Sequence, residues 1–395
     1  MSLILNHETL PTELWIEIFT HLDERSYAVS HAPFQLLPGI ASEANAGTAY
    51  TTVVLVCRNW RAWAIGFLYR NIKISDSNNM QAYDRFMDIH REYGQWVQRA
   101  ILPYSATVTE SFQAMPSTEI LSLYPNLHTL VRPPHRPLFS SLTFDFDATC
   151  PPLFSLRRLD WWNHAEASRS GGINSLIAVL CAAPNLEYLF IGIVRAQFSP
   201  FHGLGGTGQI IDLPHLRTLR LSTTTALLLR QIVAQWTLPA LDNLVMDTPM
   251  LGVGTDVMWE SFGPQLRVME LGKHIRFLLE ENIASCLRGC PSLHELNYYI
   301  FTTMLPEVDA ENIYPSITSI AINMAEVALL GELRDEWEHL ERHFNIFAGT
   351  MFPSLRQLRI YAMSERFLLD ERFPALHRQL SDRGCIVEIV EKANA

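Results

Sequence analysis

The sequence has no long apolar run and no surplus of basic charge. No stretch approaches the roughly 18 to 20 apolar residues of a membrane helix, so none is predicted. Lys and Arg number 30 against 41 Asp and Glu, and the formal net charge is −11. Such a balance disfavours nucleic acid or an anionic membrane as the main partner. The start lacks the basic and apolar segments of a signal peptide, so we expect a cytoplasmic or nuclear protein that is not secreted.

Paired cysteines are also missing. The six cysteines are scattered and never form a Cys-x-x-Cys pair, which predicts reduced thiols that mostly act as small buried apolar groups. By contrast, 48% of the 395 residues are apolar, which excludes disorder as the main state. The length suits one large domain or two to three ordinary ones.

One pattern recurs along most of the chain: a turn residue, usually proline, followed by x-Leu-x-x-Leu-x-Leu or a close relative. It occurs at 124–131, 153–161, 183–191, 213–221, 238–246, 263–271, 290–298, 314–322 and 352–360. Eight of the nine units carry the proline, at Pro125, Pro184, Pro214, Pro239, Pro264, Pro291, Pro315 and Pro353. Most intervals are 24 to 30 residues, and the last is 38. This period favours a leucine-rich-repeat solenoid.

Within each unit the apolar period of two predicts a strand. Leu189 and Ile191 would point to one face and Phe190 to the other. One strand per unit would stack beside the last, and proline would end the preceding helix and begin the extended segment. The fold class is therefore α/β, with parallel strands on one side and helices or irregular segments on the convex side. The alternative is an ordinary α/β domain with several similar units.

The segments between the strands show helical spacing. Apolar faces with steps of three and four run over 173–181, 283–290 and the long last interval near 327–347. Ala82, Phe86, Ile89 and Tyr93 predict another helix over 80–93. Residues 97–102 are expected to form a degenerate first strand, and 385–390 the last one, as atypical end units of a solenoid.

The first 75 residues lack the repeat and read as a small helical unit. Residues 10–26 carry apolar side chains at steps of four, and residues 53–75 carry a second apolar face that includes Val56, Trp60, Trp63 and Phe67. A unit of this size buries little apolar surface alone. A leftover apolar stripe on it therefore predicts a partner.

These residues resemble an F-box, and the whole chain resembles fungal F-box proteins with leucine-rich repeats. The motif opens with Leu-Pro-x-Glu-Leu at 10–14 and closes with Val-Cys-x-x-Trp at 56–60. The resemblance implies an F-box domain over 1–75 and about nine or ten repeat units over 76–395. It also implies that the residues at the motif positions contact a Skp-family adaptor, namely Leu10, Pro11, Leu14, Ile18, Phe19, Leu22, Val56, Cys57, Trp60, Leu68 and Tyr69.

One departure from the family is the span between the two halves of the motif. It is longer than expected, and the excess lies near residues 31–49, which are rich in Ala, Gly, Ser and Pro. We interpret it as an inserted surface loop, which costs little entropy. The alternative for the whole N-terminal segment is a helical cap on the solenoid.

Signals of enzyme chemistry are weak. Gly203, Gly205 and Gly208 match G-x-G-x-x-G, but no strand and helix flank them, so a flexible inserted loop is the preferred interpretation. His339 and His343 are one helical turn apart without the His-Glu-x-x-His order, and we expect a solvated charged helix face rather than a metal site. No nucleophile, metal site or cofactor is predicted, and the chain is not expected to be an enzyme.

The predicted function is therefore recognition. The resemblance implies the substrate receptor of an SCF-type cullin–RING ubiquitin ligase, which holds an unidentified target protein near other, catalytic subunits. The alternatives are a binding scaffold independent of any ligase and, with no residue in its favour, an enzyme on a repeat framework. For the target we expect the outward residues of adjacent strands, where aromatic and arginine side chains cluster: Arg158, Asp160, Tyr188, Phe190, Thr218 and Arg220.

Overall fold

The computed structural model describes residues 10–22, 32–38, 48–73, 80–102, 115–133, 144–145, 150–162, 175–192, 210–222, 226–248, 255–278, 280–307, 312–325 and 336–390. Within them the chain is a mixed α/β structure built on one sheet of twelve strands, all paired in parallel. No helix in these ranges is long and apolar enough to cross a membrane. The glycine triplet at 203–208 lies outside the described residues.

The strands of the large sheet follow one another in chain order. They are β1 (Asn71–Lys73), β2 (Arg99–Ile101), β4 (Thr129–Arg132), β6 (Arg158–Trp162), β7 (Tyr188–Gly192), β9 (Thr218–Leu221), β11 (Asn243–Met246), β12 (Val268–Leu271), β13 (Glu295–Tyr299), β14 (Ser319–Asn323), β15 (Gln357–Tyr361) and β16 (Ile386–Val390). Two small sheets pair β3 (Met115–Pro116) with β5 (Phe144–Asp145), and β8 (Ile211–Asp212) with β10 (Trp236–Thr237).

Helices occupy the connections. The α-helices are α1 (Thr12–Thr20), α2 (Thr48–Val56), α3 (Arg58–Arg70), α4 (Met80–Tyr93), α5 (Ser117–Ser122), α6 (Ser175–Ala182), α7 (Ala226–Gln235), α8 (Asp256–Phe262), α9 (Glu280–Gly289), α10 (Glu336–Ala348), α11 (Glu365–Leu368) and α12 (Phe373–Ser381). Short 3₁₀ turns are η3 (Gly94–Trp96), η6 (Gly263–Gln265), η7 (Ile275–Leu278) and η8 (Ile300–Thr302).

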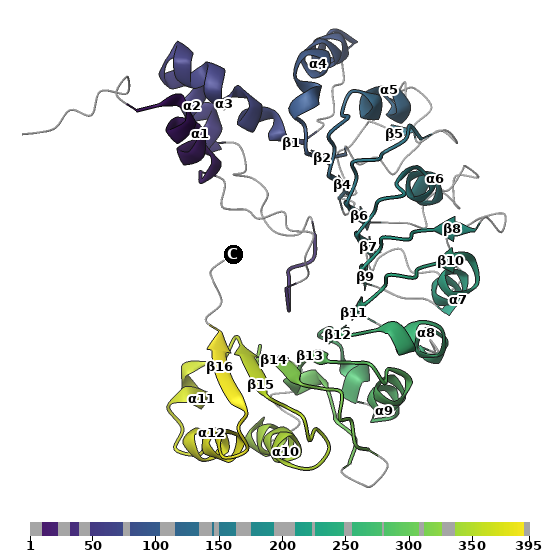
Figure 1. Cartoon of the computed structure of the whole chain (residues 1–395), viewed down its shortest axis with the longest axis vertical. Coiled ribbons are helices and arrows are strands. Elements are labelled where there is room, and N and C mark those ends of the chain that lie inside the picture. The colour runs from purple at the N-terminus through teal and green to yellow at the C-terminus, as the bar shows by residue number, and fades with distance from the viewer. Residues whose placement is uncertain are drawn as a thin grey trace, which may run out of the picture.

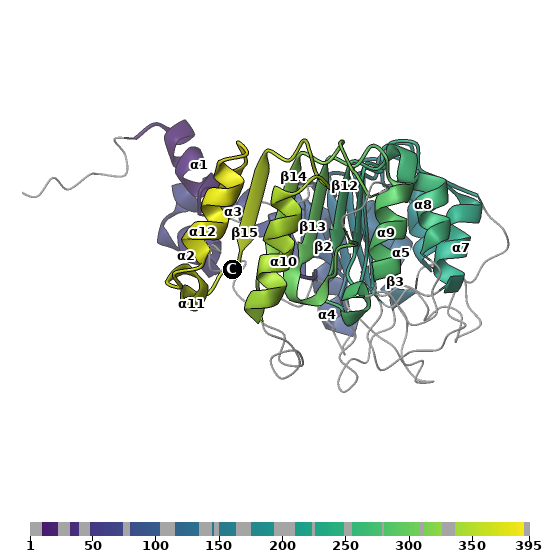
Figure 2. The ribbon, with the colours of Figure 1, turned by 90° about the horizontal axis from the view of Figure 1, so that it is seen from below.

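The sheet bends into an arc with the strands on its inner side and helices α4 to α10 on its outer side (Figure 1). Figure 2 shows α9 and α10 lying alongside the strands. The main core fills the space between these two layers. In each of the nine predicted units the same leucine position sits in one register across the sheet and is buried: Leu130, Leu159, Leu189, Leu219, Leu244, Met269, Leu296, Ile320 and Leu358.

The repeated proline has a more specific role than ending a helix. Each one follows the residue whose carbonyl accepts a hydrogen bond from the amide three positions on, as Ala183 does from Leu186 and Phe352 from Leu355. Proline therefore occupies the second position of a tight turn, where its fixed φ is favourable. The unit without proline makes the same turn, from Leu153 to Leu156.

Residues at the third turn position tie neighbouring turns together. Asn185 Nδ2 donates to the carbonyl of Phe154 at 2.9 Å, and Ser155 Oγ donates to that of Pro125 at 2.8 Å. The turns therefore form a second ladder beside the sheet.

The N-terminal part corrects two expectations. Residues 53–75 do not form one helix, because the backbone of Cys57 is extended and separates α2 from α3. Cys57 caps the start of α3: its sulfur accepts a hydrogen bond from the amide of Trp60. The segment ends in β1, a strand without repeat pattern that joins the sheet through β2. Strand β1 lies inside the region predicted as helical, and β2 is the degenerate strand predicted over 97–102.

Most predicted helices and the last strand are present. Residues 80–93 form α4; of the residues predicted on its buried face, Tyr93 is half-buried and Ile89 is exposed, while the unpredicted Met87 and His90 are buried. Helices α6, α9 and α10 lie in the three predicted intervals, and β16 closes the sheet at 386–390.

Candidate binding surfaces

The helical unit α1 to α3 has a core of its own. Phe19, Tyr50 and Ala64 are buried in it, and the phenol of Tyr50 donates to the backbone carbonyl of Phe19 at 2.9 Å. The rings of Trp15 and Trp60 lie 4.7 Å apart, and Phe19 meets Trp60 edge-on at 5.3 Å. Aromatic packing therefore holds α1 on α3 and fixes which face of α1 points outward.

The outward side of α1 exposes large aliphatic side chains among its polar ones. Leu14, Ile18 and Leu22, here called the α1 stripe, follow each other at steps of four and expose 49, 42 and 42% of their surface. At the end of α2, Leu55 and Val56 are also exposed. Large aliphatic side chains exposed together on a small helical unit make this surface a candidate for binding another protein.

The eleven residues expected to contact the adaptor separate into two groups. The α1 stripe, Val56 and Pro11 are exposed. Phe19 is buried, and Leu10, Cys57, Trp60, Leu68 and Tyr69 are half-buried. The structure therefore brings the α1 stripe together as a surface and places Phe19 and Trp60 in the core behind it.

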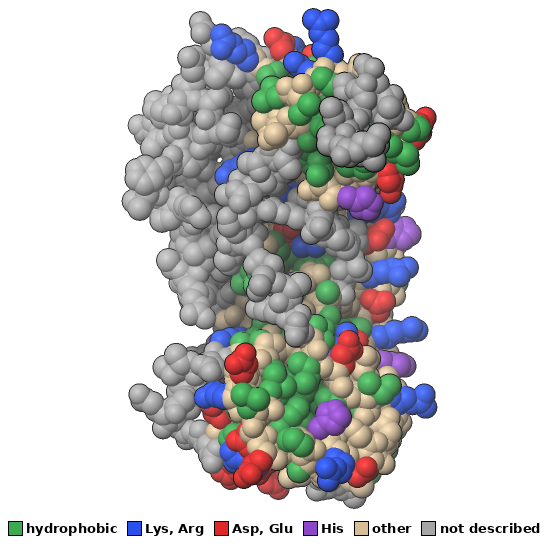
Figure 3. Space-filling view, turned by 90° about the vertical axis from the view of Figure 1, so that its left-hand side faces the viewer, with side chains coloured by type: hydrophobic (Ala, Val, Ile, Leu, Met, Phe, Trp, Pro, Cys, Tyr) green, Lys and Arg blue, Asp and Glu red, His purple; other side chains and the backbone are tan. Residues whose placement is uncertain are grey.

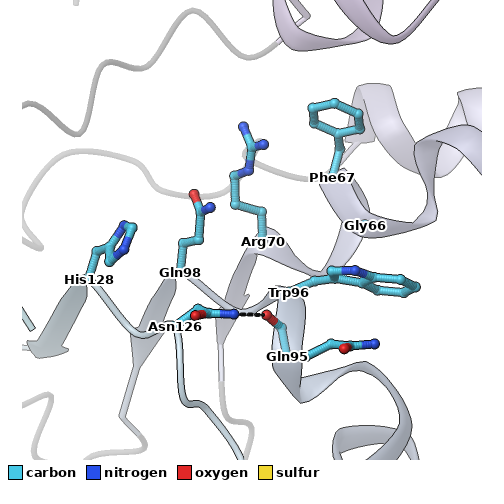
Figure 4. Close-up of a pocket in the computed structure, with 8 residues that line it drawn as sticks. All are labelled: Gly66, Phe67, Arg70, Gln95, Trp96, Gln98, Asn126 and His128. Carbon is cyan, nitrogen blue, oxygen red and sulfur yellow. Dashed lines mark hydrogen bonds between the residues drawn. The ribbon is translucent and has the colours of Figure 1, made fainter. Parts of the chain in front are cut away.

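Tyr69 connects the helical unit to the rest of the chain. Its ring stacks on Tyr93 of α4 at 4.4 Å, and Tyr93 stacks on Trp96 at 5.6 Å. Near this stack a pocket of about 360 Å³ opens between α3, η3 and the first strands (Figure 4). Arg70 and Phe67 point into it together, with the guanidinium 4.7 Å from the ring. Its other polar side chains are the amides of Gln95, Gln98 and Asn126, the Trp96 indole and the His128 imidazole.

The inner side of the arc is the second candidate surface, and part of the chain already occupies it. Residues 32–38, here called the strap, lie in the opening of the arc (Figure 1). Leu37 packs against Trp162, Tyr188 and Phe190. The inserted loop was predicted near residues 31–49; residues 32–38 of it are irregular and mostly half-buried or exposed, and they pack on the inner face, a contact that was not predicted.

Beneath the strap lies an aromatic cluster. Trp162 and Phe190 are 4.9 Å apart, and Gly192 leaves room for them, since a Cβ there would lie 2.7 Å from the Trp162 ring. The Trp162 indole N–H donates to the carbonyl of Pro38 at 2.7 Å. The Arg158 guanidinium covers the Tyr188 ring at 4.2 Å and pairs with Asp160 at 3.1 Å. Burial raises the pKa of Tyr188 to about 12.

Further along, a buried ion pair lies on the inner face. Arg220 donates from Nε and Nη2 to the two carboxylate oxygens of Asp247, both at 2.9 Å, and its Nη1 donates to the Leu36 carbonyl at 3.4 Å. Burial acts to lower the pKa of Arg220, but the attraction and hydrogen bonds of Asp247 outweigh it, so the pKa is raised. Arg220 is therefore charged and held in a two-point contact.

The other end of the strap is anchored by Phe34. Its ring meets Tyr299 at 5.2 Å and Tyr361 at 5.1 Å, edge-on in both cases. Its amide donates to Glu270 Oε2 at 3.0 Å, and its φ of 59° is left-handed. A non-glycine residue holds that conformation only where surrounding contacts enforce it.

The residues expected to meet a target therefore have a different environment from the predicted one. Tyr188 and Phe190 have no exposed surface, and Arg220 has 3%. Asp160 and Thr218 are buried, and only Arg158 is partly exposed. The sequence pattern placed these side chains on the correct face of each strand, but it did not reveal that residues 32–38 cover that face.

A row of alternating charge lines the edge where the strands begin. The residues directly before five successive strands are Arg157, Glu187, Arg217, Asp242 and Arg267. Figure 3, which looks into the inner side of the arc, shows such charged side chains along one edge. Arg157 and Glu187 pair at 3.2 Å. Because the signs alternate, this edge offers no single-sign field to attract a polyanion.

The histidine pair on α10 is buried, so the predicted solvated helix face is wrong. Both rings are buried; His343 contacts the Tyr298 hydroxyl at 2.9 Å and the Thr303 carbonyl at 3.1 Å, and His339 contacts the Ile300 carbonyl at 2.7 Å. Burial holds the pKa of His343 well below its usual range. The described residues contain no cluster of three His, Cys, Asp or Glu fit for a metal ion.

Comparison with known protein families finds no family model that matches the chain. A search of curated proteins finds no match either. A function therefore has to be inferred from the two surfaces described above.

Proposed function

We propose that the chain is the substrate-recognition subunit of an SCF-type cullin–RING ubiquitin ligase. In this proposal α1 to α3 form an F-box that docks on a Skp-family adaptor, and the sheet is a leucine-rich-repeat solenoid that holds a protein target. The α1 stripe carries the proposal. Its three leucine-sized side chains occupy motif positions, are exposed, and stand on a unit whose own core is already filled.

The link between the two parts supports this division of labour. The stack of Tyr69, Tyr93 and Trp96 joins α3 to the outer helices, and β1 continues from α3 into the sheet. A direct connection of this kind holds a target at a fixed place relative to the adaptor. Transfer to the target would then be accelerated by proximity, with the chemistry supplied by other subunits.

The test is co-purification of the chain with a recombinant Skp-family adaptor. Ile18→Asp places a charge in the middle of the α1 stripe, and Leu14→Asp places one at its first position. We expect each to reduce adaptor binding at least about a hundredfold, as loss of a well-packed apolar contact does. The matched control is Leu369→Asp. Leu369 is 83% exposed near the far end of the sheet, so the same substitution there leaves binding unchanged.

Failure of the wild-type chain to bind the adaptor would remove the ligase proposal and leave the alternative, a protein-binding scaffold independent of any ligase. Equal binding by the wild type, Ile18→Asp and Leu14→Asp would also contradict the proposed interface. Circular dichroism of each variant checks that the helices are intact.

A further inference from the structure

The strap contacts the inner face as a bound extended peptide does, largely through its backbone. The amide of Phe34 donates to Glu270, and the carbonyls of Leu36 and Pro38 accept from Arg220 and Trp162. These three contacts use groups that every peptide carries. They fix the direction and position of a segment without specifying its sequence, whereas side-chain pockets specify it.

Two pockets supply that specificity. One takes the Phe34 ring between Tyr299 and Tyr361. The other takes Leu37 against Trp162, Tyr188 and Phe190. Of the two residues between them, Gln35 and Leu36, the apolar one, Leu36, leaves 52% of its surface exposed. The inner face therefore accepts an aromatic side chain followed three positions later by an aliphatic one.

The fit of the strap is incomplete. Five buried polar atoms on the inner face have no hydrogen-bond partner in the part of the chain that the structure describes: Tyr188 Oη, Asn243 Oδ1, Asn297 Oδ1, Ser319 Oγ and Arg359 Nε. Buried polar groups are normally paired, and an unpaired one is costly. Phe34 also adopts a left-handed φ to reach its pocket. A segment with polar side chains at the right places would satisfy atoms that the strap leaves unpaired.

We propose that the inner face is a receptor for an extended peptide segment with an aromatic residue followed three positions later by a leucine-like one, and that the strap occupies this receptor until such a segment displaces it. The strap is then an internal competitor that sets a threshold for recognition. Only the identification of the displacing segment as part of a ligase target rests on the proposed function.

Competition has a quantitative consequence. A receptor that is open for a fraction of the time binds with an affinity reduced by that fraction. If the inner face is free of the strap in about a tenth of the molecules or fewer, weakening the contacts of the strap improves the affinity for a separate peptide about tenfold or more. Weakening the pockets has the opposite effect.

The probe is a fluorescein-labelled peptide with the strap's own sequence, APFQLLP, and binding to the full chain is followed by fluorescence anisotropy. In the double variant Phe34→Ala/Leu37→Ala the pockets are intact but the strap has lost both anchors. We expect this variant to bind the peptide at least about tenfold more tightly than the wild type does. The control peptide APAQLAP lacks both side chains and should bind neither protein. Adding Trp162→Phe to the double variant removes one donor and should weaken binding roughly three- to tenfold.

Four outcomes would overturn the proposal, and the first three concern peptide binding. The folded double variant does not bind APFQLLP, or it binds APFQLLP and APAQLAP alike, or the wild type binds as tightly as the double variant. If the double variant and Leu37→Ala alone both fail to fold, the strap is a permanent part of the structure and the proposal also fails. Adaptor co-purification does not involve the inner face, so failure of peptide binding and failure of the ligase proposal are separate results.

Discussion

The helical unit and the inner face of the sheet treat their apolar side chains in opposite ways. On α1 to α3 the aromatic rings are packed inward and aliphatic residues stay exposed, with Ile18 at 42%. On the inner face, which a sheet of this kind would leave open, Phe190 is fully buried because the strap covers it. An exposed stripe is available to a partner, whereas a covered face must first be uncovered. The two surfaces of one chain therefore differ in what controls access to them.

The largest expected effect comes from comparing two neighbouring residues of α1, the buried Phe19 and the exposed Ile18. Phe19 is 1% exposed and packs against Trp15 and Trp60, so Phe19→Ala should destabilise the helical unit by about 3–5 kcal/mol. Ile18→Ala removes an exposed side chain and should change stability by about 0.5 kcal/mol or less. Hydrogen exchange of the peptides spanning 48–70 reports on this unit directly. We expect protection to fall at least about a hundredfold for Phe19→Ala and to stay unchanged for Ile18→Ala.

Similar exchange in the two variants would show that Phe19 is not the centre of this core. The aromatic residues of the motif would then be available to a partner together with the α1 stripe, and the contrast between the two regions would disappear.

The ion pair of Arg220 and Asp247 tests whether the inner face is shielded from solvent. Arg220→Ala leaves Asp247, whose side chain is only 14% exposed, without its two-point partner and should destabilise the chain by about 3–5 kcal/mol, measured by urea unfolding. The matched control is Arg91→Ala. Arg91 pairs with Asp88 at 3.6 Å with both side chains more than half exposed, so its loss should cost about 0.5 kcal/mol or less.

If Arg220→Ala costs no more than Arg91→Ala, the inner face is solvated and the strap does not cover it in solution. A smaller loss for the double variant Arg220→Met/Asp247→Leu than for Arg220→Ala would instead confirm that the unpaired charge, rather than the lost contact, is the main cost.

What could be predicted from the sequence depends on the range of the contacts. The nine repeat strands followed from local spacing, because Leu189 and Ile191 carry their period within the segment itself. The α1 stripe followed from steps of four in the same way. Strand β1 could not be predicted, since Asn71-Ile72-Lys73 has no repeat signature and pairs only because β2 lies beside it.

The position of the strap could not be predicted from local sequence patterns for the same reason. Phe34 contacts Glu270, which is 236 residues away in the sequence, and no pattern near residue 34 indicates that contact. A partial signal existed in the segment itself, because Phe34, Leu36 and Leu37 are large apolar residues in a stretch otherwise typical of a loop. An apolar cluster inside an inserted loop predicts that the loop packs on something, although it does not say where.

The smallest expected effect is a pH dependence of the free energy of unfolding, which arises at His90, between the two surfaces. His90 of α4 is 8% exposed and its Nδ1 lies 3.0 Å from the Tyr124 hydroxyl at the first repeat turn. Burial lowers the pKa of His90 from 6.5 to about 4. The unfolded chain therefore takes up this proton before the folded chain does. The stabilisation is complete above pH 6.5 and is lost as the pH falls toward 4, by about 1.4 kcal/mol per pH unit and about 3 kcal/mol in all.

Urea unfolding at pH 7.5, 6.5, 5.5 and 4.5 measures this loss. His343, whose pKa burial also lowers, adds to it in the same direction, so the share of His90 requires a variant. His90→Gln keeps a polar partner for Tyr124 and cannot titrate in this range, and its stability should fall less steeply than that of the wild type. His215 is exposed, and His215→Gln should follow the wild-type curve. Parallel curves for His90→Gln and the wild type would mean that water reaches His90 between α4 and the first repeat turn, and that α4 is less firmly packed there than the contact of His90 with Tyr124 indicates.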